Sequence, residues 1–330
     1  MNILQALGGF YCTVGTIGII LNAISGIIFL TNKEFYKPAF FLMSSMCVTD
    51  LLGLLNIGVY SGYRLLTDYS NQNVTVWDHY AGISCCIEWW VGSSLFSLIA
   101  FNRFITMTRW TEVDRWFSPR KIGLYAVGPH ILFTVLTVVL FAEVDTVFPW
   151  INAVLSYAFV NKGVRIFNTG YVATCALTQV MLNTLTVLGI RRLRRNQSTV
   201  NTAGRMSEQR YRQETRLTIQ CGITSTIYCV GAAYFHVLFV LSNYMTLSTV
   251  NFVIVHCTWI THLSINPVLY FAFNRRLQEI TTAAIRYPFM KVGFVSPAVT
   301  QIVPASMPNS TQNRRGSCMS NTVRPGSNVN

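Results

Sequence analysis

"GGFYCTVGTIGIILNAISGIIFL" (residues 8–30) contains no charged side chain. A helix rises about 1.5 Å per residue and needs about 20 residues to cross about 30 Å of hydrocarbon, so this stretch is long enough to span a membrane. Six further stretches share its apolar character and sufficient length: 38–62, 79–108, 122–142, 167–190, 217–242 and 249–273. The sequence therefore predicts an all-α membrane protein built as a seven-transmembrane helix bundle.

The composition agrees with this fold class. Of the 330 residues, 52% are hydrophobic and only 11% are charged, whereas an average soluble domain has about a quarter of its residues charged. No basic residue precedes the first stretch and no small-residue cleavage pattern follows it, so we expect a permanent span rather than a signal peptide. The final segment is rich in Ser, Thr, Asn and Pro, a composition typical of disorder.

The positions of the basic residues predict the orientation. All but three of the 25 lysines and arginines lie in the loops after the first, third and fifth stretches or after the seventh; the exceptions are Arg64, Lys162 and Arg165. The positive-inside rule places the basic loops in the cytoplasm. The net charge of +13 then favours contact with anionic membrane lipid over nucleic acid. We expect a multi-pass plasma-membrane protein with its N-terminus extracellular and its C-terminus cytoplasmic.

Two short motifs predict covalent modification. Asn73-Val74-Thr75 is a glycosylation sequon in a loop that this topology places outside the cell, whereas the sequons at Asn196 and Asn309 are expected to be cytoplasmic and unmodified. Ser317 follows two arginines and a glycine, a pattern that basophilic kinases recognise. Both motifs occur often by chance.

Polar side chains inside the apolar stretches predict a polar core. Asn22, Asp50 and Asn266 each interrupt an apolar run, and Asn22 and Asp50 reach a similar depth if the first two helices are antiparallel. A lone carboxylate at that depth must be neutral or partnered, and the two asparagines are the available partners. The alternative is that these residues only join helices to one another.

Four motifs in this order resemble the rhodopsin-like G-protein-coupled receptors. They are Asn22 in "GIILNAI", Asp50 in "VTDLL", Arg103 in "FNRF", and Asn266-Pro267-Val268-Leu269-Tyr270. The following "FAFNRRLQEI" resembles the family's short amphipathic eighth helix, and the resemblance covers about residues 8–285. "FNRF" and "THLSINPVLYFAFNRR" are similar to nematode serpentine chemoreceptors of class T or class X. The implied organisation is an extracellular N-terminus (1–7), a receptor domain (8–273), a membrane-surface helix (274–287) and a disordered cytoplasmic tail (288–330).

The resemblance implies that Arg103 is a G-protein switch, held by polar contacts at rest and exposed when helix six moves outward. Asn102 stands where most of the family has an acidic residue, so the usual neighbouring ion pair cannot form. Glu214, near the start of helix six, is the nearest replacement, and Tyr270 is expected to support Arg103 from helix seven. The alternative is that Arg103 only anchors the helix at the membrane surface.

The expected ligand site lies further along the third helix. Glu88 and Trp89 precede Arg103 by 15 and 14 residues, roughly 21–23 Å along the axis. The other residues expected near this level are Tyr171, His236, His256 and Trp259. Aromatic walls with a few polar groups are typical of ligand pockets. The alternatives are that the aromatic residues serve packing and that Glu88 is a protonated structural donor.

One expected family feature is missing from the sequence. The resemblance leads us to expect a cysteine 25 residues before Arg103, disulfide-bonded to the second extracellular loop. Asp78 occupies that position, and residues 143–166 contain no cysteine. Cys85 and Cys86 lie inside the third helix instead. The bridge is therefore predicted to be absent.

The predicted function is a chemosensory receptor that couples an extracellular small molecule to a heterotrimeric G protein. The competing hypothesis, a transporter or channel, predicts self-similar halves, and the sequence shows none. The sequence shows no metal-ligand spacing, glycine-rich phosphate loop or catalytic constellation, so we expect no cofactor, no metal and no enzymatic activity. The expected partners are the ligand, the G protein and membrane lipid.

Overall fold

The structure is a computed structural model that describes residues 3–67, 75–141, 150–151, 156–157, 162–196, 208–241 and 248–291. Residues 1–280 form one compact unit and residues 281–330 form a second. Asn73 and Ser317, the predicted modification sites, lie outside the described residues, as does most of the predicted tail.

The described chain is almost entirely helical. Its elements are α1 (Ile3–Thr31), η1 (Lys33–Phe35), α2 (Pro38–Gly53), η2 (Leu54–Tyr60), α3 (Ser61–Thr67), α4 (Val76–Thr108), η3 (Trp110–Glu112), α5 (Val113–Trp116), α6 (Pro119–Phe141), β1 (Trp150–Ile151), β2 (Ser156–Tyr157), α7 (Lys162–Asn196), α8 (Glu208–Leu241), α9 (Thr249–Phe273) and α10 (Arg275–Lys291). The strands β1 and β2 are two residues long each and pair antiparallel, Trp150 with Tyr157 and Ile151 with Ser156.

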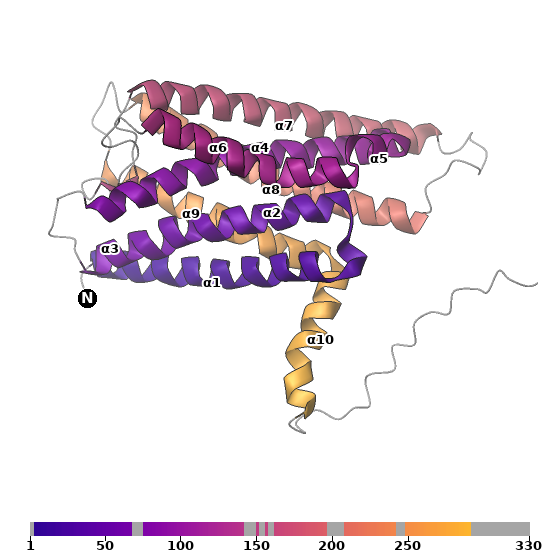
Figure 1. The fold of residues 1–330 in the computed structure, drawn as a ribbon, viewed down its shortest axis with the longest axis horizontal. Helices are drawn as coiled ribbons and strands as arrows, with labels where there is room; N and C mark the ends of the chain where they lie inside the picture. Colours follow the sequence, from indigo (N-terminus) through magenta and orange to yellow (C-terminus); the bar gives the residue numbers. More distant parts are fainter. Residues whose placement is uncertain are drawn as a thin grey trace, which may run out of the picture. The chain divides into compact units, whose positions relative to one another are not determined.

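Seven helical segments are long and apolar enough to cross a membrane, which confirms the predicted number and order of spans. The second span is the continuous run α2–η2–α3 (residues 38–67). Figure 1 shows the spans running side by side. The central helix is α4, which packs against α2, α6, α7 and α8, while α1 packs against α2, η2, α3 and α9. The end of the bundle where α4 finishes is called the Arg103 end below, and the opposite end, where α4 begins, is called the Asp78 end.

Local sequence signals explain where helices begin. Pro38 occupies the first turn of α2 after an extended Lys37, a position where its missing N–H costs no helical hydrogen bond. The start of α4 carries a capping box, in which Thr75 Oγ1 accepts from the Asp78 N–H and Asp78 Oδ2 accepts from the Thr75 N–H. Such caps satisfy the donors that a helix leaves free at its N-terminus.

Asp78 also belongs to a buried ion-pair cluster that joins α4 to the second span. Its Oδ1 lies 3.1 Å from Arg64 Nε and accepts a 3.0 Å hydrogen bond from the Tyr60 hydroxyl. The side chains of Arg64 and Asp78 are 5% and 0% exposed. Each of the eight cysteines in the described residues is a free thiol, including Cys85 and Cys86 within α4. This cluster therefore makes a polar connection between the two spans at the Asp78 end.

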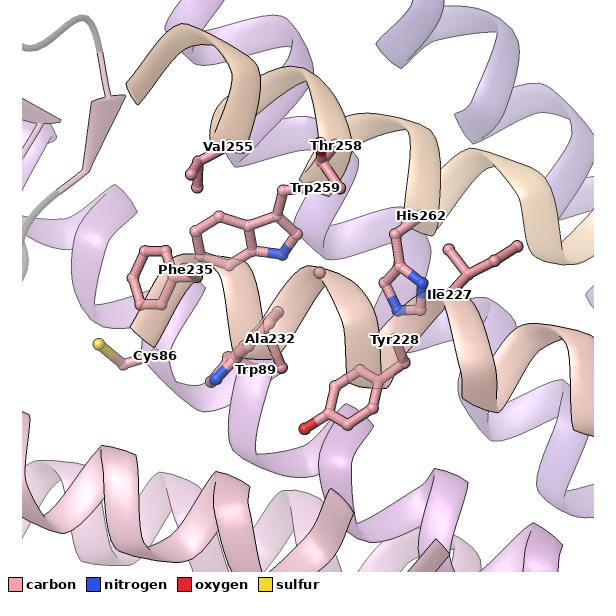
Figure 2. Close-up of a pocket in the computed structure, with 11 residues that line it drawn as sticks. Cys86, Trp89, Ile227, Tyr228, Ala232, Phe235, Val255, Thr258, Trp259 and His262 are labelled. Carbon is pink, nitrogen blue, oxygen red and sulfur yellow. The ribbon is translucent and has the colours of Figure 1, made fainter. Parts of the chain in front are cut away.

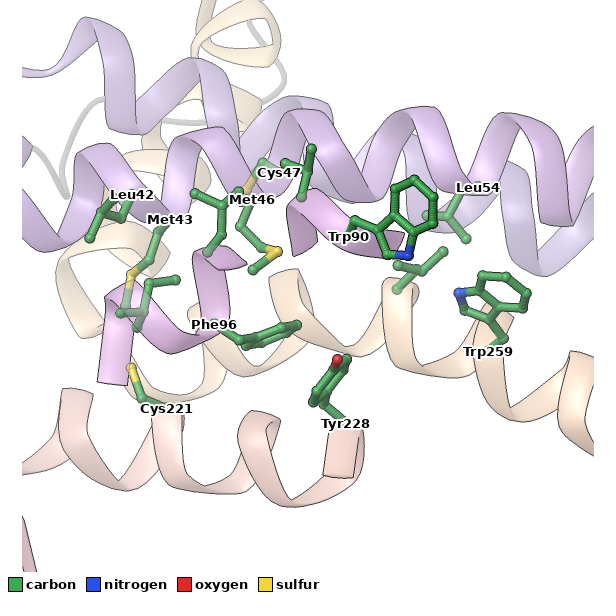
Figure 3. Packing of buried hydrophobic residues seen from close by; sticks show 14 of the residues in the cluster. Leu42, Met43, Met46, Cys47, Leu54, Trp90, Phe96, Cys221, Tyr228 and Trp259 are labelled. Carbon is green, nitrogen blue, oxygen red and sulfur yellow. The ribbon is translucent and has the colours of Figure 1, made fainter. Parts of the chain in front are cut away.

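The apolar core lies between α2, α4, α8 and α9. Figure 3 shows methionine and aromatic side chains of these helices packed together, including Met43, Met46, Phe96 and Tyr228. Large apolar side chains also cover the outer faces of the spans, among them Ile17, Leu124, Val138 and Leu177. A soluble protein rarely exposes such a surface. These side chains are suited to contact with the hydrocarbon of a membrane.

Glycine permits a close contact between α1 and η2. A Cβ added to Gly15 on α1 would lie 2.8 Å from the Cα of Gly58 in η2, a backbone atom that cannot rotate away. We expect Gly15→Ala to lower the free energy of unfolding by about 1–3 kcal/mol, the usual cost of overpacking. Denaturant unfolding of the purified protein in detergent measures this change.

Gly9→Ala is the matched control, because a Cβ added to Gly9 on the same helix has nothing within 4 Å. Alanine favours helix over glycine by up to about 1 kcal/mol, so this variant should be neutral or more stable. Equal destabilisation by both substitutions would contradict the close contact.

Candidate functional site

At the Arg103 end, a buried ion pair joins α4 to α8. Arg103 is 2% exposed, and its Nη1 lies 2.6 Å from Glu214 Oε2. Its Nη2 donates a 2.6 Å hydrogen bond to the Asn102 Oδ1. The predicted pairing with Glu214 is present, and the amide of Asn102 supplies a neutral acceptor. An arginine that only anchored the helix would extend toward water, whereas this one faces the bundle.

Tyr270 lies in α9 and is 4% exposed. Its buried ring packs edge-on against Phe29 of α1, with 5.5 Å between ring centroids. In this arrangement Tyr270 therefore joins α9 to α1. Its support of Arg103 from the seventh span remains a prediction.

The polar core contains the predicted contact between α2 and α9. Asn266 Nδ2 donates a 2.7 Å hydrogen bond to Asp50 Oδ2, and the two residues are 0% and 1% exposed. No direct hydrogen bond joins Asn22 to Asp50 among the described residues, so their pairing stays a prediction. The Asn22 amide donates instead to the carbonyls of Gly18 at 3.0 Å and Leu263 at 3.2 Å.

Pro267 explains why Asn22 has a different partner. In an α-helix the carbonyl of Leu263 accepts from the N–H four residues later, and proline has no N–H to donate. In a membrane such a carbonyl needs another donor, because no water replaces the lost bond. The Asn22 amide supplies that donor by binding the carbonyl that Pro267 leaves free. Asp50 and Asn266 form a separate hydrogen-bonded pair.

An aromatic cavity of about 30 Å³ lies between α4, α8 and α9. Figure 2 shows its walls, in which Trp89 and Trp259 meet edge to face with ring centroids 4.9 Å apart. Phe235 lies 6.2 Å from Trp89, centroid to centroid, and Tyr228 and His262 complete the aromatic lining. The cavity therefore favours a part of a ligand that is apolar or that packs against aromatic rings.

A second cavity of about 20 Å³ has two buried carboxylates in its lining. It is lined by Asp50 and Glu88 and shares Trp89, Tyr228, Trp259 and His262 with the aromatic cavity. We call these two adjoining cavities the two-part site.

The two oxygens of Glu88 have different surroundings. Oε1 accepts hydrogen bonds from Asn56 Nδ2 at 2.9 Å and from Ser84 Oγ at 2.6 Å. Oε2 is buried and has no hydrogen-bond partner among the described residues. Asn56 lies in η2, a π-helical segment that interrupts the second span. Such segments change the direction of side chains and often occur at functional sites.

Three of the six predicted ligand residues line the two-part site: Glu88, Trp89 and Trp259. The other three line neither cavity and instead join helices. Tyr171 bonds to Ser94 Oγ at 2.5 Å, His236 to Thr169 at 3.2 Å, and His256 to the Ile57 carbonyl at 2.8 Å. We expected these residues at one level along the bundle, but that level does not specify the direction in which each side chain points around its helix.

Sequence reasoning missed Tyr228, Phe235 and His262, which line the aromatic cavity. His262 had a detectable signal, because it precedes Asn266 by four residues and so shares its face of α9. Tyr228 had none, since its 2.5 Å hydrogen bond to Ser93 depends on how α8 packs against α4.

A third cavity, of about 370 Å³, opens at the Arg103 end. Its charged lining comes from Glu34, Lys37, Arg212, Glu214, Arg216, Arg275 and Arg276. Arg276 binds Glu34 through two hydrogen bonds of 2.6 and 2.7 Å, and this contact lowers the pKa of the exposed Glu34 carboxyl. The resulting surface is predominantly basic and lies beside the Arg103–Glu214 pair. In the described ranges, no group of three His, Cys, Asp or Glu residues could hold a metal ion.

Comparison with known proteins agrees with this geometry. The model of the family "Serpentine type 7TM GPCR chemoreceptor Srx" matches residues 12–274. No curated protein matches the chain. The match covers more than half of the sequence, so the chain belongs to the Srx family of seven-transmembrane G-protein-coupled chemoreceptors. It is a multi-pass membrane protein, and its family is one of receptors and not of enzymes.

Proposed function

We propose that this chemoreceptor resides in the plasma membrane with its Arg103 end in the cytoplasm, and that a small extracellular molecule binding in the two-part site activates a heterotrimeric G protein. The observation that carries this proposal is the buried Arg103–Glu214 pair, because it ties α8 to α4 beside the basic cavity. A ligand that favours separation of these helices would open the cavity by population shift. Asn102 assists at rest, and Tyr270 contributes from α9.

The polar core has a supporting role in the proposed switch. The Asp50–Asn266 bond and the Asn22–Leu263 bond both end on α9 within four residues of Pro267. A proline inside a helix weakens its backbone ladder and permits bending. These bonds therefore fix the resting position of α9 relative to α1 and α2.

The orientation can be tested by glycosylation. We expect Asn73 to carry a glycan and Asn196 to carry none, because only an extracytoplasmic sequon meets the glycosylation machinery. Mobility shifts of Asn73→Gln and Asn196→Gln after glycosidase treatment measure the occupancy of each site. A glycan on Asn196 with an unmodified Asn73 would reverse the orientation.

The remaining proposals concern the cytoplasmic surface. We assign α10 to the inner membrane surface and Ser317 to a kinase site in the following tail. The exposed pairs of Arg275 and Arg276 with Glu279 stabilise the beginning of α10.

Arg103→Lys tests whether Arg103 is a switch. Lysine keeps the charge but loses the planar fork that binds Glu214 and Asn102 together. We expect ligand-stimulated nucleotide exchange to fall by about tenfold or more, at unchanged surface expression. Exchange on a panel of purified G proteins is the measurement. Lysine extends to the membrane surface as well as arginine does, so unchanged exchange would reduce Arg103 to an anchor.

A further inference from the structure

If the protein is the receptor proposed above, on which this step rests, we infer that its ligand is a small organic cation. The geometry points to a short alkylammonium that pairs its charge with Glu88 and places its hydrocarbon part against the aromatic walls of the two-part site. The chemistry of the carboxylate, the walls and the cavity size each restricts the ligand class.

Glu88 provides an unused acceptor. The residue is 8% exposed, and its Oε2 lacks a hydrogen-bond partner among the described residues while Oε1 receives both nearby donors. Oε2 faces the second cavity, where a Cβ on Gly53 would lie only 3.3 Å from it. A buried carboxylate oxygen without a donor is unfavourable, so a donor from outside the chain would bind there.

Among the residues that the structure describes, no lysine or arginine lines either cavity. The two buried arginines of the described spans are engaged elsewhere, Arg64 with Asp78 and Arg103 with Glu214. Asp50 and Glu88, by contrast, both line the second cavity. An anionic ligand would therefore lie beside two carboxylates with no positive charge to balance it. A cationic ligand would supply both the positive charge and the N–H donors that these carboxylates lack.

The walls favour a positive charge for a second reason. Trp89, Tyr228 and Trp259 line both cavities, and the faces of such rings attract ammonium groups. Phe235 and Val255 extend the apolar lining of the first cavity. A molecule with a charged head and a hydrocarbon tail matches the polar and apolar parts together.

The volumes limit the size. The cavities measure about 30 and about 20 Å³, and one water-sized group needs about 10–15 Å³. The two-part site therefore accommodates about four non-hydrogen atoms without displacement of its walls. Propylammonium has four such atoms, and propanol and propionate are neutral and anionic analogues of similar size.

The test uses the full chain purified in lipid nanodiscs and saturation-transfer NMR with these three molecules. Titration extends to about 10 mM, because so few atoms give weak binding. We expect saturable binding of propylammonium and none of propanol or propionate. Glu88→Gln keeps an acceptor for Asn56 and Ser84 but removes the charge, and we expect it to weaken propylammonium binding by about tenfold or more. Glu88→Asp, which keeps the charge, should retain the preference for the cation.

Glu112→Gln is the matched control, since Glu112 lies in η3 beside the exposed Arg109 and should leave propylammonium binding unchanged. Three results would each overturn the inference. They are binding of propanol as tight as that of propylammonium, binding of propylammonium that is not weakened by Glu88→Gln, and no binding of propylammonium at all. G-protein exchange that depends on Arg103 would survive any of these results, so failure of the ligand class is distinguishable from failure of the receptor function. Binding of propylammonium without any nucleotide exchange on a G protein would support the ligand class and contradict the proposed receptor function.

Discussion

Glu214→Gln is expected to raise basal nucleotide exchange by about tenfold or more. The substitution removes the charge that faces Arg103 at 2.6 Å, in a site where the two side chains are 3% and 9% exposed. Breaking a buried ion pair costs about 3–5 kcal/mol when one charge is left behind. Arg103 keeps its bond to Asn102, and glutamine keeps a weaker acceptor, so we expect about half of that cost, roughly 1.5–2.5 kcal/mol. Every 1.4 kcal/mol changes the ratio of resting to active receptor tenfold.

The measurement is agonist-free exchange on purified G protein at matched receptor concentration. Glu112→Gln serves as the control, because the Arg109–Glu112 pair at 3.6 Å lies on the surface, with side chains 63% and 34% exposed. Exposed pairs contribute between about 0 and 1 kcal/mol, so this variant should signal like the wild type. Identical basal exchange in both variants would show that the buried pair does not hold the resting state.

Asp78→Ala is expected to produce the largest loss of stability. The substitution removes the carboxylate that contacts the guanidinium of Arg64 and the hydroxyl of Tyr60, and it also removes half of the capping box of α4. Losing one partner of a buried pair costs about 3–5 kcal/mol and losing a cap about 1 kcal/mol. We expect little receptor at the cell surface and a marked fall in the unfolding temperature of what is purified.

A paired replacement separates charge from packing. Arg64→Met combined with Asp78→Leu removes both charges and keeps apolar volume, and replacing both members of a buried pair is often nearly neutral. The double variant should therefore be more stable than Asp78→Ala alone, in thermal unfolding and in surface expression. A double variant that is less stable than Asp78→Ala would show that the cluster acts through something other than an unpaired charge.

The sequence predicted the helices better than the contacts between them. Uninterrupted apolar length specifies a membrane span regardless of its neighbours, so all seven spans were predictable. The 310-helical turn at Lys33–Phe35 and the π-helical segment at Leu54–Tyr60 were not, because each depends on a few local hydrogen bonds within an otherwise helical pattern. Helix α10 extends to Lys291, four residues beyond the predicted end.

The candidate site shows the same division. Glu214 and Asn266 were predictable as partners because buried charges and amides have few alternatives at one depth. Depth alone does not give the direction of a side chain around its helix, which is why His256 was expected in the ligand site and instead bonds to the Ile57 carbonyl. The bond from Asn22 to the Leu263 carbonyl was not predictable from depth, because the acceptor that Pro267 leaves free is a backbone group.

The bond between Asn22 and the Leu263 carbonyl also has a consequence for biosynthesis. It joins residues 241 positions apart, in the first and last spans of the chain. At about 5–20 residues per second, the ribosome needs roughly 12–48 s to make the intervening sequence. Throughout that interval the first span resides in the membrane without its long-range partner. The contact between α1 and α9 can therefore form only after α9 has been made. Replacing Pro267 with a residue that has a backbone N–H would give the Leu263 carbonyl its ordinary helical donor and remove the free acceptor that Asn22 binds.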